Sequence, residues 1–126
     1  MMSFDSSFSE ERHLKIKNRF KFMSETVVMI FENYKYIDIN SVKKAQKIVE
    51  IYLTGNPNHK YRASTIGAAA VYLVTHRLDS TGLQRRELTK DRLARNINVP
   101  KPTLKTWIKK VEDFLPKDGE GNIVLL

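Results

Sequence analysis

The sequence predicts an all-α domain of five helices. Apolar residues recur three or four positions apart along most of the chain, which is the period of one helix face, and no segment alternates with the period of two that a half-buried strand has. At 126 residues the chain suits one domain and is short for two. The expected organisation is a flexible N-terminus over residues 1–8, a helical domain over residues 9–115 and a C-terminal tail over residues 116–126.

The first helix is expected near residues 9–33. Ser7 and Glu10 stand three positions apart, which is the spacing of a capping box at a helix start. The apolar residues that follow form one face of the helix: Ile16, Phe20, Met23, Val27, Ile30, Phe31 and Tyr34. A second helix is expected near residues 41–54. Its N-cap is expected at Asn40 and its end at Gly55.

The third helix, expected near residues 64–78, contains the most apolar stretch of the chain. Many side chains between Ile66 and Val74 are small, so neighbouring helices can approach this one closely on every side. We therefore expect it at the centre of the bundle, with Tyr72 and Leu73 largely buried.

The last two helices are expected near residues 89–97 and 101–115, and together residues 89–115 have the pattern of a helix-turn-helix motif. Thr89 can cap the first of them, and Asn98 tolerates the left-handed conformation that a tight turn requires. Val99 is expected to fill the angle between the helices, while Pro102 suits the first turn of the second. The inward face of that second helix consists of Leu104, Ile108, Val111 and Leu115, with Trp107 at its rim.

Positive charge is concentrated in one segment of the chain. The whole sequence carries 22 Lys and Arg residues against 14 Asp and Glu residues, a net charge of +8. Residues 84–110 hold nine of these bases and two of the acids, a net charge of +7, so the rest of the chain carries only +1. This concentration is typical of a surface that binds nucleic acid, because a charge that only keeps a protein soluble is scattered.

The expected partner is therefore double-stranded DNA, bound with the second helix of the motif in the major groove. Contacts to base edges are expected from Lys101, Thr103, Lys105 and Thr106. Contacts to phosphates are expected from Arg85, Arg86, Lys90, Arg92, Lys109 and Lys110.

Three segments follow one another in a recognisable order: Ala68-Ala69-Ala70-Val71-Tyr72-Leu73, then Thr89 to Val99, then Thr103-Leu104-Lys105. This order resembles one cyclin-box repeat of the transcription factor IIB family, and most of all the second repeat, whose last two helices form a helix-turn-helix. The resemblance covers roughly Glu10 to Leu115. It implies a five-helix cyclin-like domain, a role in transcription or its regulation, and a protein of the transcription machinery as a further partner.

The chain departs from that family in three respects. Residues 60–64 lack the proline expected before the central helix, and the loop from Leu78 to Leu88 is longer and more basic than usual. The chain also has one repeat and no cysteine, so it has no zinc ribbon. It is therefore not expected to be a complete general initiation factor.

Two other functions fit the same residues. Cyclin folds also bind peptides or partner domains in grooves between helices, so the chain could be a protein-interaction adaptor that needs no DNA. A helix-turn-helix on an unrelated scaffold could instead be a dimeric repressor, with the apolar residues 123–126 as its dimer contact. Salt-dependent duplex binding distinguishes the DNA-binding protein from the adaptor, and the mass in solution distinguishes a monomer from a dimer.

No catalytic or metal-binding pattern stands out in the sequence. His13, His59 and His76 lie far apart, and there is no Ser/His/Asp set or phosphate-binding glycine loop. We therefore expect no enzyme activity, no metal and no cofactor. The chain also has no apolar run near the roughly 20 residues of a membrane span and no signal-peptide pattern, so we expect a soluble protein of the cytoplasm, nucleoid or nucleus.

Overall fold

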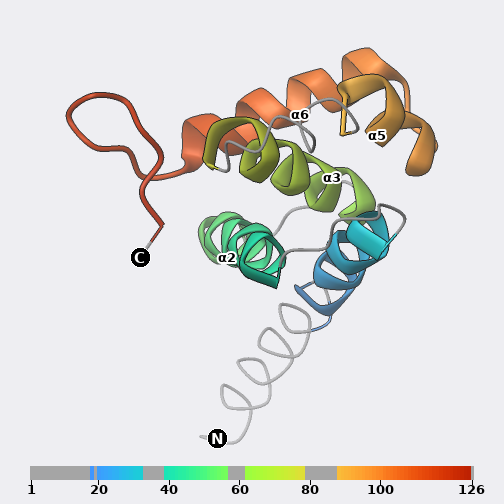
Figure 1. Cartoon of the computed structure of the whole chain (residues 1–126), viewed down its shortest axis with the longest axis horizontal. Helices are drawn as coiled ribbons and strands as arrows, with labels where there is room; N and C mark the ends of the chain where they lie inside the picture. The colour runs from blue at the N-terminus through green and yellow to red at the C-terminus, as the bar shows by residue number, and fades with distance from the viewer. Residues whose placement is uncertain (1–17, 19, 33–38, 57–61, 79–87, 126) are drawn as a thin grey trace, which may run out of the picture.

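Five helices account for most of the residues that this computed structural model describes, which are 18, 20–32, 39–56, 62–78 and 88–125. The first covers residues 20–32 and is followed by α2 (Ile39–Gly55), α3 (Ala63–Leu73), α5 (Lys90–Asn96) and α6 (Lys101–Phe114) (Figure 1). One π-helical turn, η1 (Val74–Leu78), continues α3 without a break. Within these described ranges, β-structure is limited to a single isolated bridge, so the predicted all-α class is confirmed.

Helix α3 lies at the centre of the bundle. Its residues from Thr65 to Val71 are all buried, and α2, α5 and α6 pack against it (Figure 1). The first helix crosses α3 at Gly67, where a methyl group would lie 3.0 Å from the main-chain oxygen of Met23. The distance between two packed helix axes depends on the size of the side chains between them, so small side chains permit this close approach. The central position predicted for the alanine-rich helix is therefore confirmed.

Helix α2 begins and ends differently from the prediction. It begins at Ile39, so Asn40 lies inside the helix rather than capping it, and Gly55 is its last residue rather than the residue after it. The end is completed by Asn56, whose main-chain N–H donates to the Leu53 oxygen at 3.2 Å and whose side-chain amide donates to the Tyr52 oxygen at 2.9 Å.

The glycine at position 55 has a packing reason. A methyl group there would lie 1.9 Å from Cζ of Phe114, because the Phe114 ring covers this position. The same ring meets Tyr52 edge-on, with 5.8 Å between ring centroids. Glycine at the end of α2 therefore leaves room for the Phe114 ring of α6.

Tyr72 and Leu73 differ in burial, although both are expected inside. Leu73 is completely buried, as predicted, whereas Tyr72 is only half-buried. Tyr72 packs against the core but keeps some exposure, because its ring lies at the edge of the core, stacked on the His76 ring.

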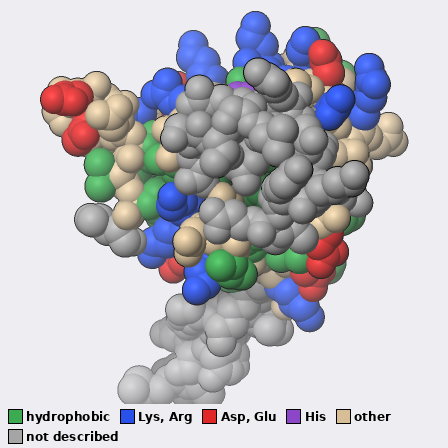
Figure 2. Space-filling view, viewed as in Figure 1, with side chains coloured by type: hydrophobic (Ala, Val, Ile, Leu, Met, Phe, Trp, Pro, Cys, Tyr) green, Lys and Arg blue, Asp and Glu red, His purple; other side chains and the backbone are tan. Residues whose placement is uncertain are grey.

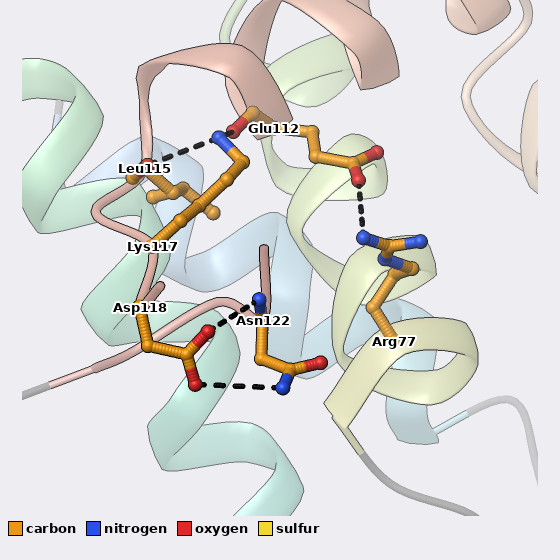
Figure 3. Close-up of polar contacts among 6 residues, drawn as sticks. All are labelled: Arg77, Glu112, Leu115, Lys117, Asp118 and Asn122. Carbon is orange, nitrogen blue, oxygen red and sulfur yellow. Dashed lines mark hydrogen bonds and ion pairs between the residues drawn. The ribbon is translucent and has the colours of Figure 1, made fainter. Parts of the chain in front are cut away.

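The C-terminal segment folds back on the helices. Ile123 is buried in the core, and Leu125 is half-buried against it. The main-chain N–H of Asn122 donates to the Asp118 carboxylate at 2.9 Å (Figure 3). The main-chain N–H of Glu120 donates to the same carboxylate at 2.9 Å. Nζ of Lys117 donates to two main-chain oxygens at the end of α6 (Figure 3). One belongs to Glu112, in the last turn of the helix, at 2.6 Å, and the other to Leu115, the residue after the helix, at 3.1 Å.

Some expectations fall on residues outside the described ranges. These include the flexible N-terminus over residues 1–8 and the capping box of Ser7 and Glu10. In the described ranges, no helix is both long enough and apolar enough to cross a membrane.

Candidate nucleic-acid interface

Helices α5 and α6 and the turn between them contain most of the residues predicted to bind DNA, and we call residues 89–114 the α5–α6 unit. Thr89 begins α5 in the expected way, since its side-chain oxygen accepts a hydrogen bond from the main-chain N–H of Arg92 at 3.3 Å. Leu93 and Ala94 on the inner face are buried.

The turn between the helices has the hydrogen bonds of a Schellman motif. Asn98 has a positive φ of 55°, the left-handed conformation predicted for it. Its N–H donates to the Arg95 oxygen at 3.2 Å, and the N–H of Val99 donates to the Ala94 oxygen at 3.0 Å. Val99 is buried, as expected for a side chain that fills the angle between the two helices.

A contact from a distant part of the chain also supports this turn. Nη1 of Arg62, the residue that precedes α3, donates to the main-chain oxygen of Asn98 at 3.3 Å. The guanidinium group therefore adds positive charge beside the turn. Sequence reasoning missed Arg62 because the two residues lie 36 positions apart.

Helix α6 presents the two faces that the sequence predicts. Leu104, Ile108 and Val111 are buried, and α6 packs along α3. Pro102 lies in the first turn, where the missing N–H has no helical partner to lose. Trp107 is half-buried at the rim of the core, as expected.

The predicted base-reading residues lie on the first two turns of α6. Lys101, Lys105 and Thr106 are exposed, whereas Thr103 is half-buried. Two of these groups have partners: Nζ of Lys101 lies 3.2 Å from Oδ1 of Asp91, and the Thr106 hydroxyl donates to the Pro102 oxygen at 3.0 Å. The Lys101–Asp91 pair is exposed and joins the first turns of α5 and α6, so it contributes little to stability.

The predicted phosphate contacts are distributed over both helices. Arg92 and Lys109 are exposed, and several Lys and Arg side chains follow the edge of the molecule where α5 and α6 lie (Figure 2). Lys110 is exposed with its Nζ 4.6 Å from the centre of the Trp107 ring, and Lys90 has its Nζ 5.2 Å from the centre of the Tyr72 ring. Arg85 and Arg86 lie outside the described residues.

Two further groups, which the sequence did not single out as binding residues, border the α5–α6 unit from η1. His76 stacks on Tyr72 with 4.0 Å between ring centroids, and Arg77 pairs with Glu112 of α6 at 2.9 Å (Figure 3). Both side chains lie on the π-helical turn η1, which continues α3. A π turn has no simple sequence signature.

No metal-binding arrangement is visible among the described residues, where His, Asp and Glu do not gather in groups of three or more. His13 and His59 lie outside these residues.

Comparisons with protein-family models, with curated proteins and with solved structures found no match. The class of protein is therefore defined by its fold alone, an all-helical domain of five helices.

Proposed function

We propose that this protein binds double-stranded DNA through the α5–α6 unit, which acts as a helix-turn-helix on a cyclin-like domain, and that it serves as a regulator or accessory factor of transcription. Helix α6 enters the major groove with its first two turns, where Lys101, Thr103, Lys105 and Thr106 face the bases. Lys and Arg side chains on both helices contact the phosphates.

One observation carries the proposal. The α5–α6 unit buries its apolar side chains and leaves Lys and Arg side chains exposed on both helices, and it contains seven bases against three acids, a net charge of +4. Because duplex DNA presents a dense array of phosphates, such a surface attracts it without regard to sequence. The transcriptional role rests on the resemblance to the transcription factor IIB family in the order of Ala68–Leu73, Thr89–Val99 and Thr103–Lys105.

A second function, protein binding, is favoured by a different surface. Phe22, Met29 and Ile39 are large apolar side chains with exposed fractions of 62%, 45% and 61%, and they lie on the first helix and at the start of α2. An adaptor that docks a partner on these residues would have no need of DNA. A dimeric repressor remains the third candidate, and its test is the mass in solution.

The deciding experiment is a titration of a labelled random duplex at several salt concentrations. We expect log K to fall linearly with log salt, with a slope of about 0.9 per phosphate neutralised. Replacing Arg85, Arg86 and Lys90 together by Glu should weaken binding equally on every duplex sequence, because phosphate contacts carry no sequence information.

A matched variant controls for the change in total charge. Replacing Lys43, Lys44 and Lys47 of α2 by Glu alters the net charge by the same amount outside the basic segment of residues 84–110. This variant should retain most of the affinity. Absence of duplex binding by the parent protein at low salt would refute DNA binding and favour the adaptor, whereas equal losses in the two triple variants would show that only net charge matters.

A further inference from the structure

A groove runs beside α6 on the side that faces η1. Its walls come from the end of α3, from η1, from the first residue of α5 and from α6. It includes Lys105 and Thr106 from the predicted base-reading turns of α6 and extends beyond them, toward Lys109 and Asp113. We call it the η1–α6 groove.

The hydrogen bond of His76 in this groove defines which ring nitrogen carries a proton. Nε2 of His76 lies 2.9 Å from the main-chain oxygen of Leu88. Because a carbonyl oxygen only accepts, Nε2 is the donor, and Nδ1 is the nitrogen that can take up a second proton. The stack on Tyr72 holds the ring in this orientation.

The charged groups around His76 leave the groove positive. On η1 itself, Arg77 is paired with Glu112 of α6, so these two charges offset each other (Figure 3). From α5, Lys90 lies over the Tyr72 ring on which His76 stacks. The remaining charges come from α6: Lys105, Lys109, Lys110 and Asp113. Apart from the Arg77–Glu112 pair, the described lining thus has four cations and one acid.

We propose that the η1–α6 groove takes the phosphate backbone of one DNA strand and that His76 gains a proton at Nδ1 when the strand binds. This inference rests on the proposed function. It adds His76 to the DNA-binding residues and links DNA binding to the uptake of one proton. The phosphates lie between Lys90 and Lys109, while the first turns of α6 reach the bases. A nearby phosphate favours the imidazolium form through charge attraction, and histidine is the side chain whose charge ordinarily changes near neutral pH. Binding is therefore linked to protonation.

The test measures protons taken up when the full chain binds a duplex. Calorimetric titrations at pH 7 in two buffers with different ionisation enthalpies give this number directly. We expect net uptake by the parent protein and an affinity that rises as the pH is lowered from 8 to 6, by at most about tenfold per pH unit for one linked proton. The His76→Gln variant should bind with no net uptake and a flat pH profile, because glutamine can still donate to the Leu88 oxygen but does not titrate.

Two controls separate this role from a structural one. His59→Gln, at a position outside the described residues, removes another histidine and should leave the uptake unchanged. Lys109→Ala should reduce the slope of log K against log salt by about one phosphate contact, whereas Lys43→Ala on α2 should not change it.

The outcomes distinguish this inference from the proposed function. Duplex binding by the parent protein without proton uptake, or with uptake that persists in His76→Gln, would overturn the role of His76 and leave DNA binding intact. Absence of duplex binding would overturn both. If His76→Gln does not fold, the imidazole signals of the parent protein give the answer at a fixed pH near 7. The protonated fraction of His76 should rise when duplex is added, and an unchanged fraction would overturn the proposal.

Discussion

Gly67 of α3 faces the main-chain oxygen of Met23 in the first helix so closely that a methyl group at position 67 would lie 3.0 Å from it. The Thr26 side chain would lie at the same distance. Backbone cannot swing aside as a side chain can, so a larger residue must push the two helices apart. We expect Gly67→Val to lower the free energy of unfolding by about 1–3 kcal/mol, the usual cost of overpacking.

Gly119 is the matched control for Gly67→Val in a denaturant melt. A Cβ atom there meets nothing within 4 Å, so Gly119→Val should change the free energy of unfolding by less than about 0.5 kcal/mol. Equal small effects for the two variants would mean that the first helix does not cross α3 at this position.

Leu73 is completely buried at the end of α3, so Leu73→Ala should leave a cavity in the core. The expected loss in free energy of unfolding is roughly 2–5 kcal/mol. Tyr72 next to it is only half-buried, and Tyr72→Phe keeps the ring that stacks on His76. That variant should therefore change stability much less. A loss below about 1 kcal/mol for Leu73→Ala in a urea melt would contradict the central position of α3.

Asn98 stabilises the turn through its left-handed conformation, with φ at 55°. Glycine adopts this conformation without strain, whereas a β-branched residue does not. We expect Asn98→Gly to leave stability nearly unchanged and Asn98→Val to lower it by about 1–2 kcal/mol. Thermal melts of the two variants side by side provide the measurement. If valine and glycine are tolerated equally, the turn does not depend on a left-handed residue.

This turn was predictable from the sequence because most of the interactions that form it are local. Thr89, Asn98 and Pro102 each act within a few residues of their own position, and the structure has each of them in the expected role. The spacing of apolar residues on α6 is equally local, so its buried face was also predictable.

Interactions between distant segments could not be predicted in the same way. Glycine is a residue type typical of helix ends, which is why Gly55 was predicted as a helix stop. In the structure, the absence of a side chain at Gly55 also leaves room for the Phe114 ring. The contact of Arg62 with the Asn98 oxygen has the same character, since it depends on how α3 meets the α5–α6 unit. His76 and Arg77, which border α6, lie on a π-helical turn, and the apolar spacing does not indicate such a turn.

Asp118 should make a pH-dependent contribution to the C-terminal turn. The main-chain N–H groups of Asn122 and Glu120 donate to its carboxylate and hold its pKa below the ordinary value. A group whose pKa is lower in the folded state stabilises that state above the pH at which the unfolded group titrates, about 3.9 for aspartate. The contribution is present at neutral pH and is lost as the pH falls below about 4 and through the folded pKa.

Carboxyl and amide NMR signals can check this behaviour. The Asp118 carboxyl signal should titrate with a midpoint below the ordinary aspartate value, and the Glu120 and Asn122 amide signals should follow it. Asp118→Asn should abolish this titration. An Asp118 midpoint at or above the ordinary value would contradict the hydrogen bonds.

The last prediction concerns sequence recognition by α6. Lys105 is exposed on the second turn of the helix, where a residue in the major groove can donate to O6 and N7 of guanine. Lys110 lies further along the helix, over the Trp107 ring, and is expected above a phosphate. Lys105→Ala should therefore cost about 1–3 kcal/mol on a preferred site and much less on random duplex, whereas Lys110→Ala should weaken both by similar factors.

This comparison needs a preferred site, which selection from a random duplex library provides. Both variants are then titrated against the selected and the scrambled duplex at one salt concentration, because affinities at different salt cannot be compared. Equal losses on the two duplexes for Lys105→Ala would mean that Lys105 contacts only the backbone. The claim of direct readout by α6 would then fail, which would leave a non-specific or partner-directed DNA-binding protein.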